Sequence, residues 1–252
     1  MQPPEPAPEL SVVAPLYGNA ATLRELVERV SASLEGVDWE LILVDDASPD
    51  GAGELALQIA TEQPRLGVVA LEKNGGQSEA LRVGALASRG KRIAFIDADL
   101  QDPPEILPRL LAAAGEADLV FGIRRGAYQS WPRRLSSAIF KSLRSRLCRV
   151  PPGAGLLLIA SGDLLRDVAR AAPHPCFFIP LLGARHPKMA ALPVERQPRQ
   201  VGESAYRGLM RWKVGLAEIE AALRLRRGRP AGEPRQEEPA VRRAVLPGSL
   251  IR

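Results

Sequence analysis

Three carboxylates lie within six positions in the segment IDADLQDPPE, residues 96–105, at Asp97, Asp99 and Asp102. The apolar run at 92–96 is predicted to be a short buried strand, which the two prolines prevent from continuing. Like charges gathered at the end of a strand are unfavourable unless a cation or a hydrogen-bonding ligand meets them. An acidic surface loop that leads into a helix is the alternative, and an isolated Asp-x-Asp motif does not decide between the two.

A second acidic pair, Asp45 and Asp46, ends another predicted strand. Apolar strands are expected at 10–15, 39–44, 67–71, 92–96 and 119–122, with helices between them at 20–34, 53–63, 77–88 and 104–114. This alternation predicts an α/β fold with a mostly parallel central sheet flanked by helices. Because ligands of such sheets bind at the carboxyl ends of the strands, we expect both acidic pairs on one edge of the sheet.

The two ends of the chain differ in composition from its middle. Residues 1–9 are expected to be a disordered leader, residues 10–227 a single domain, and residues 228–252 a flexible tail rich in Pro, Gly, Glu and Arg. No signal-peptide pattern begins the sequence, and no apolar run approaches the ~18 residues that span a bilayer. Cys148 and Cys176 form no metal-binding or disulfide pattern. They are expected to be structural thiols of a cytoplasmic protein.

Two stretches combine basic charge with a helical apolar period. Residues 124–149 contain eight basic residues and no acid. Their apolar residues recur every four positions, at Trp131, Leu135, Ile139, Leu143 and Leu147. The second stretch, residues 211–227, carries Trp212, Leu216, Ile219 and Leu223 on one side. Each pattern is typical of an amphipathic helix, which either lies on a membrane surface or packs on the core with a solvated basic face.

The net charge of +5 favours an anionic partner, such as an anionic membrane surface or a phosphorylated substrate. Together with the basic helices, it suggests peripheral association with the inner membrane face. Nucleic acid is a poorer candidate, because charge alone suggests it and only 4% of the residues are aromatic.

Four segments in order resemble the glycosyltransferase family 2 nucleotide-sugar transferases: VVAPLYGNAATL, VDDASPDG, KNGGQSEALRVGALASRG and FIDADLQDPPE. A later segment, RQVGESAY at 199–206, is similar to a motif of the dolichyl- or polyprenyl-phosphate mannosyl- and glucosyltransferase branch. The resemblance covers residues 11–149 and implies a GT-A type, Rossmann-like fold with amphipathic helices toward the C-terminus. The first strand is not followed by the Gly-x-Gly-x-x-Gly of dinucleotide-binding proteins.

The resemblance implies a nucleotide-diphosphate sugar, GDP- or UDP-linked, as donor. The implied nucleotide-binding residues are Pro15, Tyr17, Asp45, Asp46, Asn74, Gly76, Gln77 and Asp97. The implied ligands of Mg²⁺ or Mn²⁺ are Asp97, Asp99 and Gln101, which offer the hard oxygen atoms that these ions prefer. Such a cation neutralises charge on the departing diphosphate. The segment from Asn74 to Gln77 also fits an ordinary helix start that needs glycine.

A polyprenyl-phosphate-like lipid is the implied acceptor, and it is already ionised, so it needs little help from a general base. The residues implied to meet its phosphate are Arg124, Arg133, Arg134, Ser137, Arg199 and Ser204. Arg124 joins Asp97 and Asp99 as an implied catalytic residue. Neither His174 nor His186 has the setting of a base, since both lie in loops flanked by proline.

The acceptor half of the sequence departs from the family pattern. An expected acid is replaced by Pro151 or Pro152, and an expected Arg or Lys by Leu157. An expected His-Arg pair reads Pro175-Cys176, Ala205 stands where Lys is usual before Tyr206, and Gly18-Asn19 replace Asn-Glu. The departures imply a different acceptor, or reduced or lost activity. The leading hypothesis is a metal-dependent transferase with a lipid-phosphate acceptor. The alternatives are a transferase with a soluble acceptor and a catalytically weak module that binds nucleotide sugar.

Overall fold

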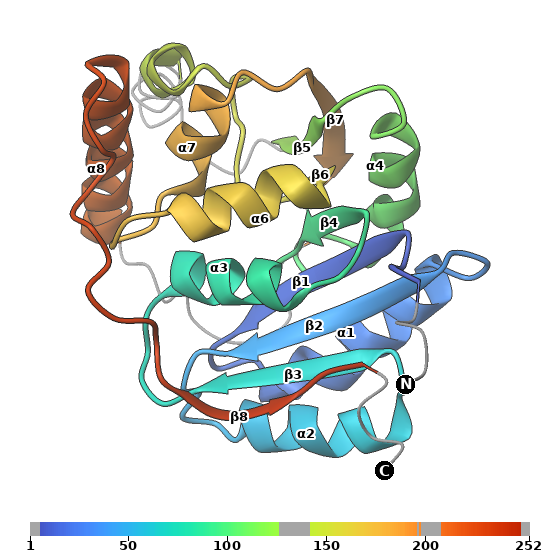
Figure 1. The fold of residues 1–252 in the computed structure, drawn as a ribbon. Coiled ribbons are helices and arrows are strands. Elements are labelled where there is room, and N and C mark those ends of the chain that lie inside the picture. The colour runs from blue at the N-terminus through green and yellow to red at the C-terminus, as the bar shows by residue number, and fades with distance from the viewer. Residues whose placement is uncertain (1–5, 126–141, 196, 198–207, 248–252) are drawn as a thin grey trace.

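The computed structural model describes residues 6–125, 142–195, 197 and 208–247, without the side chains of residue 125 and residues 208–213. Its centre is a sheet of eight strands in the order β7-β5-β6-β4-β1-β2-β3-β8 (Figure 1). The strands β1 (Leu10–Leu16), β2 (Trp39–Asp45), β3 (Leu66–Leu71) and β4 (Arg92–Phe95) run parallel to one another. These four strands were predicted from their apolar runs, and their ends agree to within about a residue.

Helices cover both faces of the sheet, as the alternating pattern predicts. The helices α1 (Ala20–Ser33), α2 (Ala52–Glu62) and α4 (Leu107–Ala113) pack with one face, and α3 (Gln77–Ala87) packs with the other. Alternate residues of β1 point to opposite faces of the sheet. Val12 packs in the apolar cluster that includes α1, and Val13 packs in the cluster that includes α3. A short 3₁₀ turn, η1 (Pro104–Ile106), precedes α4 where a single helix was expected.

The second half of the domain inserts an antiparallel strand into the sheet. Strand β6 (Leu158–Ser161) pairs antiparallel with β4 and with β5 (Leu119–Arg125), and β5 pairs parallel with β7 (Met189–Glu195). The helices α6 (Gly162–Ala171) and α7 (Phe178–Ala184) lie on the α3 side. The sequence prediction missed these two helices and the strands β6 and β7, which lie among prolines and glycines.

The first basic helix was predicted to begin at Arg124, and this boundary is wrong. Arg124 belongs to β5, because its strand continues in register with β7 up to residue 125. The chain is helical again at 142–148. The predicted apolar positions Trp131, Leu135 and Ile139 lie outside the described residues. No helix in the described segments is long and apolar enough to cross a membrane.

The second basic helix is α8 (Gly208–Arg226). Its small residues Ala221 and Ala222 are buried, whereas Leu216, on the predicted apolar side, is 58% exposed. For Leu216, packing on the core is therefore excluded.

Both predictions of disorder need correction. The expected flexible tail contains strand β8 (Val241–Val245), which pairs antiparallel with β3 at the edge of the sheet. Arg235 in the same segment donates two hydrogen bonds to Glu79. In the expected leader, Pro8 is buried and accepts a hydrogen bond from the backbone N–H of Lys91. The described parts of the two segments, residues 6–9 and 228–247, form backbone hydrogen bonds that local composition does not reveal.

Candidate active site

The site is centred on Asp97, the second residue after the end of β4. Its Oδ1 accepts a hydrogen bond from Gln77 Nε2 at 2.5 Å, and its Oδ2 lies 2.7 Å from Arg124 Nη2. Gln77 is the first residue of α3, and Arg124 is near the end of β5. Three predicted site residues from separate elements therefore meet at one edge of the sheet.

Asp102 fixes the orientation of Arg124. The Asp102 side chain is fully buried and accepts hydrogen bonds from Arg124 Nε at 2.9 and 3.1 Å and from Nη2. This carboxylate was noticed in the sequence but given no role in the predicted site. No local signal marks it, because its partner is 22 residues away on a strand whose neighbours were not predicted.

The turn at 97–101 presents Asp99 and Gln101 at the rim of the site. Leu100, between them, is buried with a left-handed φ of 58°, and the Gln101 N–H donates to Asp99 Oδ1 at 3.1 Å. Thr22 of α1 donates to the Ala98 carbonyl at 2.8 Å and so attaches the turn to the domain. A left-handed non-glycine residue persists only where its surroundings impose it, and such residues gather at functional sites.

Asp45 and Asp46 lie at the same edge but are almost completely buried. Both oxygens of Asp46 accept backbone N–H groups, from Gly75 at 2.7 Å and Gly76 at 2.9 Å. Asp45 accepts the N–H of Ser48 at 3.0 Å. The geometry gives Asp46 a structural task, to hold the loop before α3. Its predicted contact with the nucleotide stays a prediction.

The other predicted nucleotide-binding residues surround this edge. Tyr17, just after β1, is 47% exposed, and Pro15 is half-buried. Asn74 is exposed in the loop before α3. Gly76 has a φ of 86°, a backbone conformation that glycine adopts without strain. The helix-start explanation and the binding explanation of this loop both agree with that geometry.

The charges of the site are strongly perturbed by burial. Burial raises the pKa of Asp97, the positive charge of Arg124 opposes the rise, and the neighbouring Asp102 and Asp99 add to it. Burial also raises the pKa of Asp46 against the two backbone hydrogen bonds that lower it. For Arg124, burial lowers the pKa, but the hydrogen bond to Asp102 and the two carboxylate charges outweigh it, so that the pKa is raised. Such clusters of shifted groups are typical of functional sites.

We predict that Asp97→Asn makes the ligand-free protein more stable at neutral pH. The folded pKa of Asp97 lies above the unfolded value of about 3.9. The folded state therefore holds the proton more tightly, and stability falls as the pH rises through the folded pKa. The amide removes this penalty, and the Gln77 side chain can reverse to accept from it. We expect the variant to melt at a higher temperature than the parent protein at pH 7.

Thermal melts of the parent protein and Asp97→Asn from pH 4 to pH 8 without metal would check this. The difference in melting temperature between the two proteins should vanish near pH 4, where the Asp97 carboxyl of the unfolded chain is half protonated. A variant that is less stable than the parent at pH 7 would contradict the direction of the pKa shift.

The oxygen atoms at the rim suit a hard divalent cation. Asp97, Asp99 and Gln101 supply carboxylate and amide oxygens, the donors that Mg²⁺ and Mn²⁺ accept together with substrate phosphates. Among the described residues, no group of three or more His, Cys, Asp or Glu side chains could hold a metal ion. The predicted set, two carboxylates and an amide, is compatible with an ion that is shared with a bound diphosphate.

Most of the predicted acceptor residues lie outside the described residues: Arg133, Arg134, Ser137, Arg199 and Ser204. Of the departures from the family pattern, Leu157 is buried in the core against Gly122. An arginine there would bury an unpaired charge, so that position is structural in this chain. Cys176 is also buried, and burial raises the pKa of its thiol to about 12, as it does for Cys148. Both thiols are structural, as predicted.

The mostly parallel sheet, with an acidic turn after β4 and a buried acidic pair at the end of β2, has a fold of the GT-A type. Residues 11–153 match the glycosyl transferase family 2. Because this match covers more than half of the chain, the protein belongs to that family.

One relative shares 35% identity over 205 residues, the undecaprenyl-phosphate 4-deoxy-4-formamido-L-arabinose transferase of Enterobacter sp. (strain 638). The match covers 79% of this chain and 62% of the relative, so the chain spans less than two thirds of that protein.

Two solved structures with low sequence identity share the fold. Glucosyl-3-phosphoglycerate synthase from Mycobacterium tuberculosis, in complex with Mn²⁺, UDP and glucosyl-3-phosphoglycerate, has a TM-score of 0.60 at 22% identity, covering 97% of this chain and 92% of that one. A mannosyltransferase from Pyrobaculum calidifontis, in complex with GDP-Man and Mn²⁺, has a TM-score of 0.55 at 18% identity, covering 87% and 64%.

Proposed function

We propose that the protein transfers a sugar from a UDP- or GDP-linked donor to the phosphate of a polyprenyl lipid, with Mg²⁺ or Mn²⁺ as cofactor. The observation that carries the proposal is the meeting of Asp97, Gln77 and Arg124 beside Asp99 at the carboxyl edge of the sheet. The name of the Enterobacter relative supports the acceptor class. The Mn²⁺ and the nucleotides bound in the two solved structures support the donor and cofactor classes.

Each residue of the site has a separate task in this proposal. Asp97, Asp99 and Gln101 would hold the cation, which neutralises charge on the leaving diphosphate. Arg124, held by Asp102, presents a fixed guanidinium to the acceptor phosphate, and guanidinium groups suit phosphate oxygens well. The acceptor phosphate attacks the sugar carbon as an anion. No residue has to remove a proton from it.

The acceptor phosphate belongs to a lipid, so the enzyme would work as a peripheral protein on the cytoplasmic face of the membrane. The exposed Leu216 and the basic residues of α8 support this location.

A module that binds nucleotide sugar without transferring it is the second candidate. It is favoured by Leu157, which is buried and cannot offer the cation usual at that position. If the family residues matter here, transfer to ordinary polyprenyl phosphate will be slower than in relatives that keep them.

A thermal-shift screen of UDP and GDP, each with Mn²⁺ or with EDTA, tests the donor half of the proposal. A nucleotide that binds the folded state raises its melting temperature, and a concentration of 100 times Kd corresponds to about 2.7 kcal/mol. We expect a shift with one nucleotide that depends on Mn²⁺. No shift with either nucleotide up to millimolar concentration would exclude both the transferase and the binding module.

A further inference from the structure

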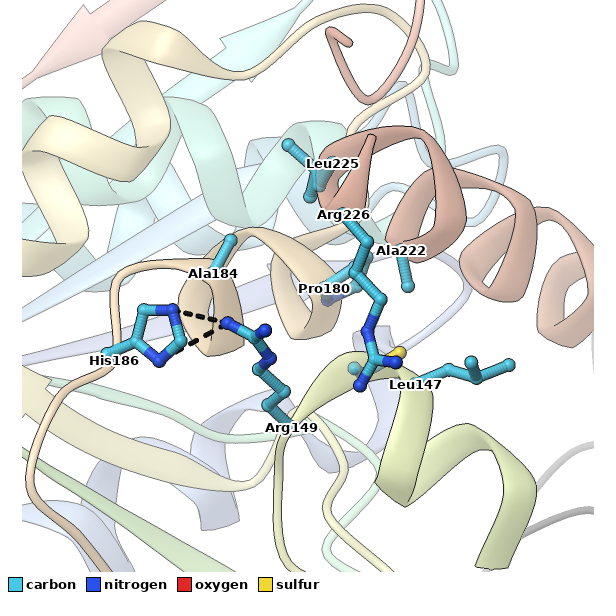
Figure 2. Close-up of a pocket in the computed structure, with 9 residues that line it drawn as sticks. Leu147, Arg149, Pro180, Ala184, His186, Ala222, Leu225 and Arg226 are labelled. Carbon is cyan, nitrogen blue, oxygen red and sulfur yellow. Dashed lines mark hydrogen bonds between the residues drawn. The ribbon is translucent and has the colours of Figure 1, made fainter. Parts of the chain in front are cut away.

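A cavity of about 170 Å³ opens between helix 142–148, α7 and α8, and Figure 2 shows its lining. It shares no residue with the candidate active site. The polar side chains that line it are Arg149, His186 and Arg226, and the apolar ones include Leu147, Pro180 and Leu225. The volume far exceeds the ~10–15 Å³ that a single water needs.

The lining carries positive charge without a negative partner. Arg149 and Arg226 are both exposed, and neither forms an ion pair with a carboxylate among the described residues. Arg149 Nη1 contacts the ring of His186, with 2.5 Å to Nε2 (Figure 2). Glu218, an acid on the same helix as Arg226, is occupied by Arg144 at 2.8 Å. The cavity therefore offers cations to a ligand from outside the described chain.

Arg226 has one internal task, which leaves most of its donors free. Its Nη2 donates to the Arg146 carbonyl at 2.6 Å, near the carboxyl end of helix 142–148. A guanidinium has five N–H donors, so this bond alone does not satisfy it.

Close packing fixes the wall that carries Arg149. A Cβ on Gly183 of α7 would come within 1.7 Å of the Cys148 carbonyl oxygen, so the two segments touch through their backbones. Arg149 and His186 both have left-handed backbones, with φ of 56° and 52°. The backbone that carries these two side chains is thus held at the wall of the cavity by close packing.

Exposed leucines lie on the same pair of helices. Leu143 on helix 142–148 is 49% exposed, and Leu216 on α8 is 58% exposed. The Arg144–Glu218 ion pair ties the two helices together. Exposed apolar side chains beside arginines are typical of surfaces that sit in the interface of an anionic membrane.

We infer that this cavity binds the phosphate of an anionic phospholipid head group through Arg149 and Arg226, with Leu143 and Leu216 entering the membrane interface. Paired guanidinium groups match phosphate oxygens in charge and geometry. The inference deepens the proposed membrane location and rests on it. A lipid is chosen over free phosphate because the exposed leucines would have no part in binding a soluble ion.

The test is co-sedimentation with vesicles of phosphatidylcholine, with or without 30% phosphatidylglycerol, at low and at physiological salt. The variant is Arg149→Gln with Arg226→Gln. The control with matched charge is Arg24→Gln with Arg170→Gln, which removes two exposed arginines from α1 and α6. Each basic residue near an anionic surface contributes about 1 kcal/mol. We therefore expect an approximately thirtyfold loss of vesicle affinity for the cavity variant, and a loss of no more than threefold for the control.

Equal losses in the two variants, or no binding of the parent to phosphatidylglycerol vesicles, would overturn the inference. A second result would also overturn it: inorganic phosphate raises the melting temperature of the parent protein but not of the double variant, and the parent does not bind vesicles. The cavity would then bind a soluble phosphate and not a lipid. If the double variant does not fold, Arg149→Gln alone repeats the test without disturbing α8. The melting shifts caused by UDP and GDP should be the same in the cavity variant as in the parent protein. If neither nucleotide shifts the parent, the proposed function fails, whatever the vesicle experiment shows.

Discussion

Asp99→Asn is expected to lower sugar transfer by roughly 10²–10³-fold, the usual effect of removing one group that stabilises transition-state charge. The carboxylate lies at the rim of the site and accepts a hydrogen bond from the Gln101 N–H at 3.1 Å. Asparagine keeps that acceptor and the shape of the side chain. It removes the negative charge that a divalent cation requires. Affinity for Mn²⁺ in the presence of nucleoside diphosphate, measured by calorimetry, should fall together with the rate.

Asp163→Asn is the matched control, because this aspartate is 96% exposed in the first turn of α6, outside the candidate site. Both variants should melt within about 1–2 °C of the parent, as surface substitutions usually change stability by less than about 0.5 kcal/mol. If Asp99→Asn bound Mn²⁺ and nucleotide as tightly as the parent, Asp99 would not be a metal ligand.

Glu79→Ala is expected to destabilise the fold by about 3–5 kcal/mol, because it breaks a buried ion-pair network. Glu79 and Arg82 in α3 are both buried, and Arg82 Nε donates a hydrogen bond to Glu79 Oε1 at 3.0 Å. Arg235 donates to both oxygens of Glu79, at 2.9 and 2.7 Å. Without Glu79, Arg82 would keep its contact with Glu238, and Arg235 would lose the carboxylate that accepts its two hydrogen bonds. Urea unfolding of both proteins would measure the loss.

Glu72→Ala, an exposed acid in the loop after β3, is the control and should change stability by less than about 0.5 kcal/mol. Deletion of residues 229–252 should destabilise the protein at least as much as Glu79→Ala, since it removes Arg235, Glu238 and strand β8 together. If Glu79→Ala had the same urea midpoint as the control variant, the tail would add nothing to the stability of the fold through this ion-pair network.

The four parallel strands were predictable because each is mostly apolar and almost entirely buried on both faces, which the sequence pattern reveals. Asp97 and Asp99 were found for the same reason, since the end of such a strand places them at the ligand-binding edge. Strand β8 was not predictable. It is short and charged, as edge strands often are, and its partner β3 lies about 170 residues earlier.

The Arg124–Asp102 pair shows why the site was only partly predictable. Arg124 was predicted through the family resemblance, but on a helix, because its basic neighbours suggested one. Its true position depends on β5 pairing with β6 and β7, contacts that no local pattern encodes. Likewise, the hydrogen bonds of Asp46 to Gly75 and Gly76 join residues 29 and 30 positions apart.

The most direct test is the transfer of radiolabelled sugar from UDP- and GDP-sugars to undecaprenyl phosphate by the unmodified protein, with Mn²⁺ and with EDTA. We predict that labelled lipid accumulates with one donor when Mn²⁺ is present, and that it is absent with EDTA and strongly reduced for Asp99→Asn. Equal product in EDTA would contradict a role for the metal. Nucleotide binding without labelled lipid from any donor would contradict transfer to a lipid phosphate.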